Sequence, residues 1–307
     1  FSPKPTWSLR GAWISYPSPA TIPGSAKGMM KILKPTATMA ATALLAGLVA
    51  AAPVTAGFYT FASADMALGN LRLTFSGPDA ALTWEDEWFG EVPARAQDTV
   101  FGSDDAFDAF LGNAGDITAT VQTTHVSSLA TYQVIDGENV AIDPGSSIVA
   151  TTRSELEIAG KNRQGDGAAN ARFDNYFSIA SLNPSGSTIA VTLLLDYAGA
   201  LTGTADAGGF FDVTSGAFIE LYAVDQVTGD VSDLLAFDQV FDTATGTNRS
   251  YTNALTGTLA IIVNLFDNQT YWLYAEADSE TYGAVPLPAT LPLMLLGFGL
   301  LAWRRRR

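Results

Sequence analysis

The segment STIAVTLLLDY, residues 187–197, decides the fold class of this 307-residue chain. Its apolar side chains recur at every second position: Ile189, Val191, Leu193, Leu195 and Tyr197. The positions between them are small or polar, except for Leu194. A period of two places successive side chains on opposite faces of an extended chain, so the segment predicts a half-buried β-strand.

Other segments follow the same pattern. Residues 217–225 alternate in the same way. Residues 259–266 and 271–276 flank a polar turn and predict a hairpin. Residues 132–135 and 139–142 flank Asp136-Gly137, a dipeptide that favours tight hairpin turns. The chain is therefore expected to be mainly β.

Turn signals separate these predicted strands. Asp143-Pro144-Gly145, residues 183–186 and residues 227–230 combine proline, glycine, asparagine or aspartate. The glycine-rich stretch 199–209 is expected to be a loop. Turns at this spacing predict an antiparallel β-sandwich-like domain.

One short helix is also predicted. Ser103 can cap its start, and Asp104 and Asp105 would lie at the positive end of the helix dipole. Gly112 can end the helix. Its apolar face would carry Phe107, Phe110 and Leu111.

Residues 29–56 have the order of parts of an export signal. A basic start containing Lys31 and Lys34 precedes an apolar stretch at 39–52, and small residues follow. This order predicts a signal peptide cleaved by signal peptidase between Ala56 and Gly57. The alternative is a permanent N-terminal transmembrane helix.

Residues 1–28 are expected to stand apart from the domain. The segment begins with Phe1, holds five prolines and has no periodic apolar pattern. We expect it to be upstream sequence read in frame, or a disordered segment, with Met29 or Met30 as the start.

The C-terminal residues 285–307 have a different order of parts. Val285, Pro286, Leu287, Pro288 and Ala289 come first, and an apolar run from Thr290 to Trp303 follows. The chain then ends in Arg304, Arg305, Arg306 and Arg307. An apolar segment followed by a basic cluster predicts a short transmembrane helix with its arginines on the cytoplasmic side.

These residues resemble the PEP-CTERM sorting signal of Gram-negative bacteria, in its VPLPA variant. Leu287 stands where the commonest form has Glu. The resemblance implies recognition and processing by an exosortase-type membrane enzyme, with transient anchoring in the inner membrane before passage to the surface. The alternative is an ordinary single-span anchor that is never cleaved.

The region between the two signals, residues 57–284, is strongly acidic. It contains all 31 acidic residues and seven of the 16 basic ones, so its net charge is −24. Such a domain repels phosphate groups, so nucleic acid is not expected as a partner. The chain has no cysteine, so an exported domain must be stable without disulfides.

The sequence offers few groups for catalysis. His125 is the only histidine of the chain, and Lys161 is the only lysine of residues 57–284. Nucleophilic triads and zinc sites therefore lack partners, and no phosphate-binding glycine motif is present. The densest acidic cluster, Trp84-Glu85-Asp86-Glu87-Trp88-Phe89, could supply the carboxylate pair of a glycosidase.

Cofactors are not expected, apart from calcium. Asp225, Asp230 and Asp233 lie around one predicted turn and carry the hard oxygen ligands that calcium prefers. Their spacing does not match an EF-hand loop, and ordinary turn aspartates are the alternative.

Three classes of function therefore compete. The first is a non-catalytic cell-surface or extracellular-matrix protein. The second is a carbohydrate-binding β-sandwich associated with secreted exopolysaccharide, with Trp84, Trp88, Trp272 and Tyr274 as its contacts. The third is a secreted glycoside hydrolase that uses a carboxylate pair. We expect the first class.

Overall fold

The structure, a computed structural model, describes residues 58–76, 80–99, 102–181 and 187–285. The predicted signal peptide, the segment before it, the turn at 183–186 and the chain after Val285 lie outside these ranges. The strands are β1 (Tyr59–Phe75), β2 (Ala81–Trp84), β3 (Phe89–Asp98), β4 (Gly102–Leu111), β5 (Gly115–Gln122), β6 (Val126–Ile135), β7 (Ser147–Ala159), β8 (Arg163–Ala180), β9 (Thr188–Val224), β10 (Val231–Phe266) and β11 (Thr270–Val285). A 3₁₀ turn, η1, spans Gly137–Asn139.

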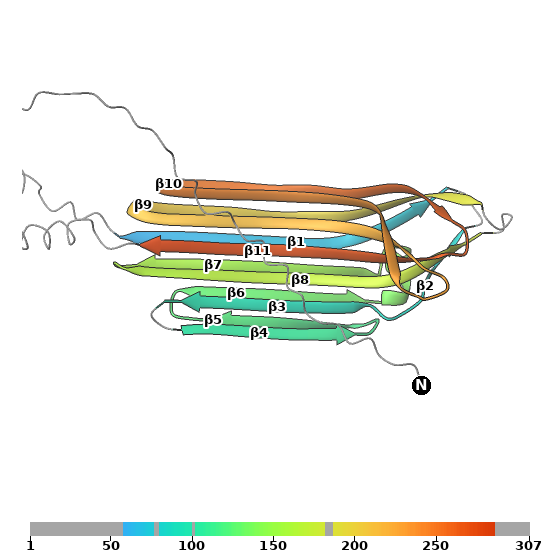
Figure 1. Cartoon of the computed structure of the whole chain (residues 1–307), viewed down its shortest axis with the longest axis horizontal. Helices are drawn as coiled ribbons and strands as arrows, with labels where there is room; N and C mark the ends of the chain where they lie inside the picture. The colour runs from blue at the N-terminus through green and yellow to red at the C-terminus, as the bar shows by residue number, and fades with distance from the viewer. Residues whose placement is uncertain (1–57, 77–79, 100–101, 182–186, 286–307) are drawn as a thin grey trace, which may run out of the picture. The chain divides into compact units, whose positions relative to one another are not determined.

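The strands form one antiparallel sheet that doubles over into two layers. Its hydrogen-bonded order is β4-β3-β8-β11-β9-β1-β7-β6-β5, with β10 beside β9 and β2 beside β8. Strands that are not neighbours in this order also touch: β11 contacts β1, β8 contacts β7, β3 contacts β6 and β4 contacts β5. Each of these pairs lies one behind the other in Figure 1. The expected antiparallel, sandwich-like β architecture is confirmed.

The long strand β9 passes from one layer to the other. Its residues 191–205 pair with β1, whereas its residues 210–223 pair with β11. The change of layer falls at Gly208, whose φ of +97° favours glycine. β10 follows β9 through the same change, with a register shift between Thr247 and Arg249. The β9–β10 ribbon thus closes one side of the sandwich (Figure 1).

The core lies between the two layers and is built by alternation. In the segment 187–197, Ile189, Val191, Leu193 and Leu195 are all buried, as predicted. Ile219 and Leu221 are buried in the second half of β9, which confirms that alternation too. Removing these side chains from water is the main favourable contribution to folding.

Hydroxyl groups join the layers inside the core. Thr152 on β7 bonds to Ser279 on β11 at 2.7 Å, and Ser154 bonds to Thr281 at 2.8 Å. Ser128 on β6 donates to the carbonyl of Arg95 on β3 at 2.8 Å. Because buried hydroxyls cost free energy when unpaired, these bonds fix how one layer sits on the other.

The predicted helix at Ser103–Gly112 is wrong, because residues 102–111 form strand β4. Ten residues of β4 pair with β3, from Gly102 opposite Asp98 to Leu111 opposite Phe89. Phe107 and Leu111 are both 62% exposed, so they build no helical face against the core. The ladder of backbone bonds to β3 outweighs a weak helical pattern. The aspartates of β4 protect an edge strand instead of capping a helix.

Both predicted hairpins are also wrong in detail. β10 and β11 are joined by a short turn, but β10 pairs with β9, and β11 pairs with β8 and β9. The turn therefore leads from one layer to the other. After β6 the chain forms η1 and a further turn, so residues 139–142 are not the partner strand. β6 pairs instead with β7, which begins at Ser147.

The glycine-rich stretch 199–209 is part of β9 and not a loop. A side chain at Gly203 would lie 2.1 Å from the ring of Phe211, and one at Gly199 would lie 2.6 Å from the carbonyl oxygen of Asp65. The glycines mark close approach inside the fold. By contrast, the turn predicted at 227–230 joins β9 to β10 as expected.

Within the ranges that the structure covers, no helix is long and apolar enough to cross a membrane. The predicted C-terminal span begins after Val285 and lies outside these ranges.

Candidate functional site

The outer faces of β8, β11 and β9 carry a group of aromatic side chains that we call the outer strip. It is defined by Tyr176, Phe218, Tyr222, Trp272 and Tyr274. All five are half-buried and lie opposite the core-facing positions of their strands. In the sheet register, Trp272 lies directly between Tyr176 and Tyr222.

Neighbouring rings of the outer strip are in contact. The ring centroids of Trp272 lie 5.3 Å from Tyr222, 5.4 Å from Tyr274 and 6.5 Å from Tyr176. Tyr274 lies 5.6 Å from Phe218, and all four pairs are tilted by 33–43°. Three of the four pairs join neighbouring strands, and such cross-strand pairs stabilise a sheet. Together the rings form a continuous surface.

Carboxylates alternate with these rings. Tyr274 pairs in register with Asp174 on β8 and with Glu220 on β9, and Glu220 lies opposite Phe237 on β10. The carboxylates also orient the rings. Trp272 Nε1 donates to Asp174 at 3.0 Å, and the Tyr222 hydroxyl donates to Glu220 at 2.7 Å. The Tyr274 hydroxyl donates to Glu276.

Partial burial changes the ionisation of this face. Burial raises the pKa of Asp174 to about 6, although the bond from Trp272 and the charge of Arg172 oppose the shift. Burial, followed by repulsion from Glu280 and Glu276, raises the pKa of Asp278 to about 7. Arg172 on β8 forms an ion pair with Glu91, and Arg95 on the neighbouring strand β3 forms one with Asp166. Asp174, Glu220, Glu276, Asp278 and Glu280 are therefore in excess of the cations on this face.

A hollow of about 330 Å³ lies at one end of the outer strip. It is lined by Asp86, Glu87, Phe89, Leu111, Asp174, Asn175 and Tyr176. Asp86 and Glu87 of the predicted cluster at 84–89 thus line the same hollow as Asp174 and Tyr176. The sequence alone does not indicate that these residues are neighbours. Asn175 is buried, and its Nδ2 has no hydrogen-bond partner in the described part of the chain.

The tryptophans of that cluster face the other way. Trp88 is fully buried and donates to the carbonyl of Gly137 at 2.8 Å. Trp84 packs 4.5 Å from Trp88 and donates to the carbonyl of Val140. Their expected role as exposed sugar contacts is wrong for Trp88, which is part of the core, and Trp84 is partly buried against that core. Trp272 and Tyr274, named for the same role, lie on the outer strip.

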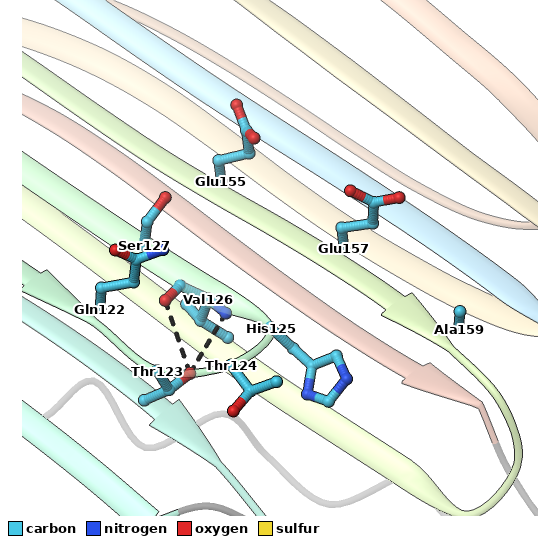
Figure 2. Close-up of a pocket in the computed structure, with 9 residues that line it drawn as sticks. All are labelled: Gln122, Thr123, Thr124, His125, Val126, Ser127, Glu155, Glu157 and Ala159. Atoms are coloured by element: carbon cyan, nitrogen blue, oxygen red, sulfur yellow. Dashed lines mark hydrogen bonds between the residues drawn. The ribbon is translucent and has the colours of Figure 1, made fainter.

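The single histidine lies in a second hollow of about 330 Å³, between β5, β6 and β7 (Figure 2). Asp98 Oδ2 lies 2.5 Å from His125 Nδ1, and Arg163 lies 2.7 Å from His125 Nε2. We call these three residues the His125 cluster. Because a guanidinium only donates, Nε2 accepts and the proton sits on Nδ1, where it bonds to Asp98.

The His125 cluster thus uses both ring nitrogens within the fold. The carboxylates of Glu155 and Glu157, which line the same hollow, point away from the imidazole in Figure 2. A general base must present a free nitrogen to its substrate, and in this arrangement Arg163 occupies that position. The geometry therefore favours a structural role for His125.

The predicted calcium candidates lie at the β9–β10 turn. Asp225 accepts the backbone N–H groups of Val227 and Thr228 at 2.7 and 3.0 Å. These bonds lower the pKa of Asp225. Among the described residues, no group of three or more acids or histidines is placed to hold a metal ion. Binding of calcium by Asp225, Asp230 and Asp233 stays a prediction.

Comparison with known proteins identifies the C-terminal segment. The profile of the PEP-CTERM protein-sorting motif matches residues 284–307, which confirms the expected sorting signal. The motif supports an exported protein that is sorted by an exosortase-type enzyme. No curated protein and no solved structure matches the chain.

The match begins at the edge of the described fold. Val285, the first residue of the Val-Pro-Leu-Pro-Ala sequence, is also the last residue of β11 and is fully buried opposite Arg163. The sorting motif therefore begins with the last two residues of β11, Ala284 and Val285.

Proposed function

We propose that this chain is an exported, non-catalytic cell-surface or extracellular-matrix protein. The observation that carries the proposal is the sorting motif at residues 284–307. In this proposal the signal peptide at 29–56 is removed, the C-terminal segment anchors the protein transiently in the inner membrane, and an exosortase-type enzyme processes it. The acidic domain then reaches the surface.

Fractionation of native cells tests this route. An internally tagged full-length chain is compared with a variant that lacks residues 285–307. We expect the full-length chain at the surface or in the medium, at a smaller mass than its precursor. The truncated variant should be exported but lost from the surface fraction. Equal distribution of the two chains would contradict the proposal.

A second variant separates a sorting signal from a permanent anchor. Replacing Pro286 and Pro288 by alanine keeps the apolar run and the four arginines. Sorting predicts that this variant accumulates unprocessed in the membrane. An ordinary anchor predicts no change, since the span and its flanking charges are intact.

Carbohydrate binding is the second candidate function, and the outer strip is the observation that favours it. Its rings and carboxylates lie on a solvent-facing sheet surface, whereas the buried faces of the same strands already form the core. A binding module of this kind would hold the exported protein on secreted exopolysaccharide.

The glycosidase alternative rests on the hollow lined by Asp86, Glu87 and Asp174. A pair of this kind requires one protonated acid and one ionised carboxylate. An Asp174 pKa of about 6 suits the first role. Our proposal expects no new reducing ends when the protein is incubated with polysaccharide. Release that stops with Asp174→Asn would favour the hydrolase instead.

A further inference from the structure

Acidic and aromatic side chains are arranged in regular rows across the outer strip and the strand beside it. Across four strands, one register row reads Asp174, Tyr274, Glu220 and Phe237, so acid and ring alternate. The row beside it reads Tyr176, Trp272 and Tyr222, with three rings in succession. The result is a ring surface bordered by hydrogen-bond acceptors.

The rings are held in place before any ligand arrives. Trp272 Nε1 and the hydroxyls of Tyr222 and Tyr274 each donate to a carboxylate of the same face. Their polar ends are therefore fixed, and the flat parts of the rings remain for contact. Groups ordered in advance lose less conformational entropy on binding.

The carboxylates keep acceptor capacity after these bonds. An ionised carboxylate has about four lone-pair sites and no donor. Glu220 accepts one bond from Tyr222, and Asp174 accepts one from Trp272. A fitting ligand must therefore bring donors to the acids and an apolar face to the rings.

Sugar rings meet both requirements. A pyranose has an apolar C–H face that can stack on an aromatic ring and hydroxyls at its rim that can donate to carboxylates. An apolar protein surface would bury these acids without donors, which is unfavourable. Nucleic acid bases could stack on the rings, but phosphates would meet uncompensated negative charge.

The negative charge of this face restricts which polysaccharides can bind. Glu276, Asp278 and Glu280 follow one another on the outer face of β11. The arginines of the neighbouring strands on this face are already paired, Arg172 with Glu91 and Arg95 with Asp166. Polysaccharides built from uronic acids would be repelled. Uncharged chains would not.

We propose that the outer strip binds an uncharged, hydroxyl-rich polysaccharide. Trp272 and Tyr274 stack on its pyranose rings, and Glu220 and Asp174 accept its hydroxyls. The hollow lined by Asp86, Glu87 and Tyr176 continues this surface past the edge of β8, so a chain longer than one sugar is accommodated. The inference deepens the proposed function and rests on the exported location, where such polymers are met.

Affinity electrophoresis of the full-length protein in mild detergent tests the proposal. The gels contain hydroxyethyl cellulose, dextran or galactomannan as uncharged probes, and alginate as the uronate probe. We expect retardation by at least one uncharged polymer and none by alginate. Absence of retardation by all three uncharged polymers, or equal retardation by alginate, would overturn the proposal.

Variants locate the binding surface. Trp272→Ala should weaken binding about tenfold or more, because a stacking ring is lost. Glu220→Gln keeps the size of the side chain but weakens the acceptor, and about threefold weaker binding is expected. The matched control is Tyr282→Ala, since Tyr282 is exposed on the same strand and face but lies beyond the strip. It should change binding by less than about twofold.

A purely structural role of the rings predicts a different result. Trp272→Ala would then lower the melting temperature while leaving any retardation unchanged, and this outcome would overturn the proposal. Trp272→Tyr guards against misfolding, because it retains a ring and should restore most of the binding. The binding assay uses purified protein, so its result does not depend on where the protein is found in cells. Failure of the binding proposal can therefore be distinguished from failure of the sorting proposal.

Discussion

The outer strip and the His125 cluster both gather ionisable side chains, but they balance charge in different ways. In the His125 cluster an acid, an imidazole and a guanidinium bond in series, and the acid is buried. Around the outer strip several acids share a face with two arginines that are already paired. A series of matched partners contributes to stability, whereas surplus acceptors lower stability and remain available to a ligand. We therefore assign a structural role to the His125 cluster, where each group has a partner. We assign a binding role to the outer strip, where acceptors remain unused.

The largest effect is expected in the His125 cluster. His125→Ala removes one partner of Asp98, whose side chain is only 1% exposed, and it also removes the acceptor of Arg163. It should lower the free energy of unfolding by about 2–4 kcal/mol. Chemical denaturation at pH 7 measures the loss.

An unchanged free energy of unfolding for His125→Ala would contradict the structural role of the His125 cluster. Thr124→Ala, at an exposed position of the same hollow, is the control and should be nearly neutral. An unchanged stability for His125→Ala together with lost polysaccharide binding would make His125 a functional residue.

A smaller and pH-dependent effect is expected beside the outer strip. The folded pKa of Asp278 is about 7, above its ordinary value of 3.8, so its proton favours the folded state. The destabilisation is therefore absent below about pH 4, grows between pH 4 and 7, and is complete above pH 7. Asp278→Asn should raise stability at pH 8 by roughly 2 kcal/mol and leave it unchanged near pH 4.

Melting curves at pH 4, 6 and 8 measure this difference. Asp105→Asn, on the exposed edge strand β4, is the control and should shift all three curves equally. A gain for Asp278→Asn that is the same at every pH would show that Asp278 is not an unbalanced acceptor.

The smallest effect is expected from calcium. The carboxylate of Asp225 already accepts two backbone N–H groups, so its Oδ1 serves the turn. Adding calcium and then a chelator should move the melting temperature by less than about 1 °C, since little binding energy is available. A larger shift that Asp225→Ala and Asp230→Ala abolish would confirm the predicted calcium site.

The sequence predicted the local elements of the fold better than their pairing. Alternation identified strands at 187–197 and 217–225, because one face of each is buried. It could not reveal that both belong to one strand of 37 residues that changes layer at Gly208. The helix predicted at 103–112 failed because pairing with β3, a long-range interaction, decided the conformation.

The same limit applies to the candidate site. The sequence suggests Trp272 and Tyr274 as sugar contacts, along with Trp84 and Trp88. Only Trp272 and Tyr274 share the outer face, because residues i and i+2 of a strand lie on the same side. Tyr176 and Tyr222 were missed because they join this face only through sheet register. One signal was available: Phe218, Glu220 and Tyr222 alternate in step with buried residues and resemble the pattern of 272–276.

The position of β11 sets an order of events. Among the described strands β11 comes last in the sequence, yet it lies in the interior of the sheet between β8 and β9. A chain that leaves the cytoplasm with its N-terminus first therefore lacks its central strand until residues 270–285 have crossed. The sorting motif begins with the last two residues of β11, so this strand would cross immediately before the rest of the motif.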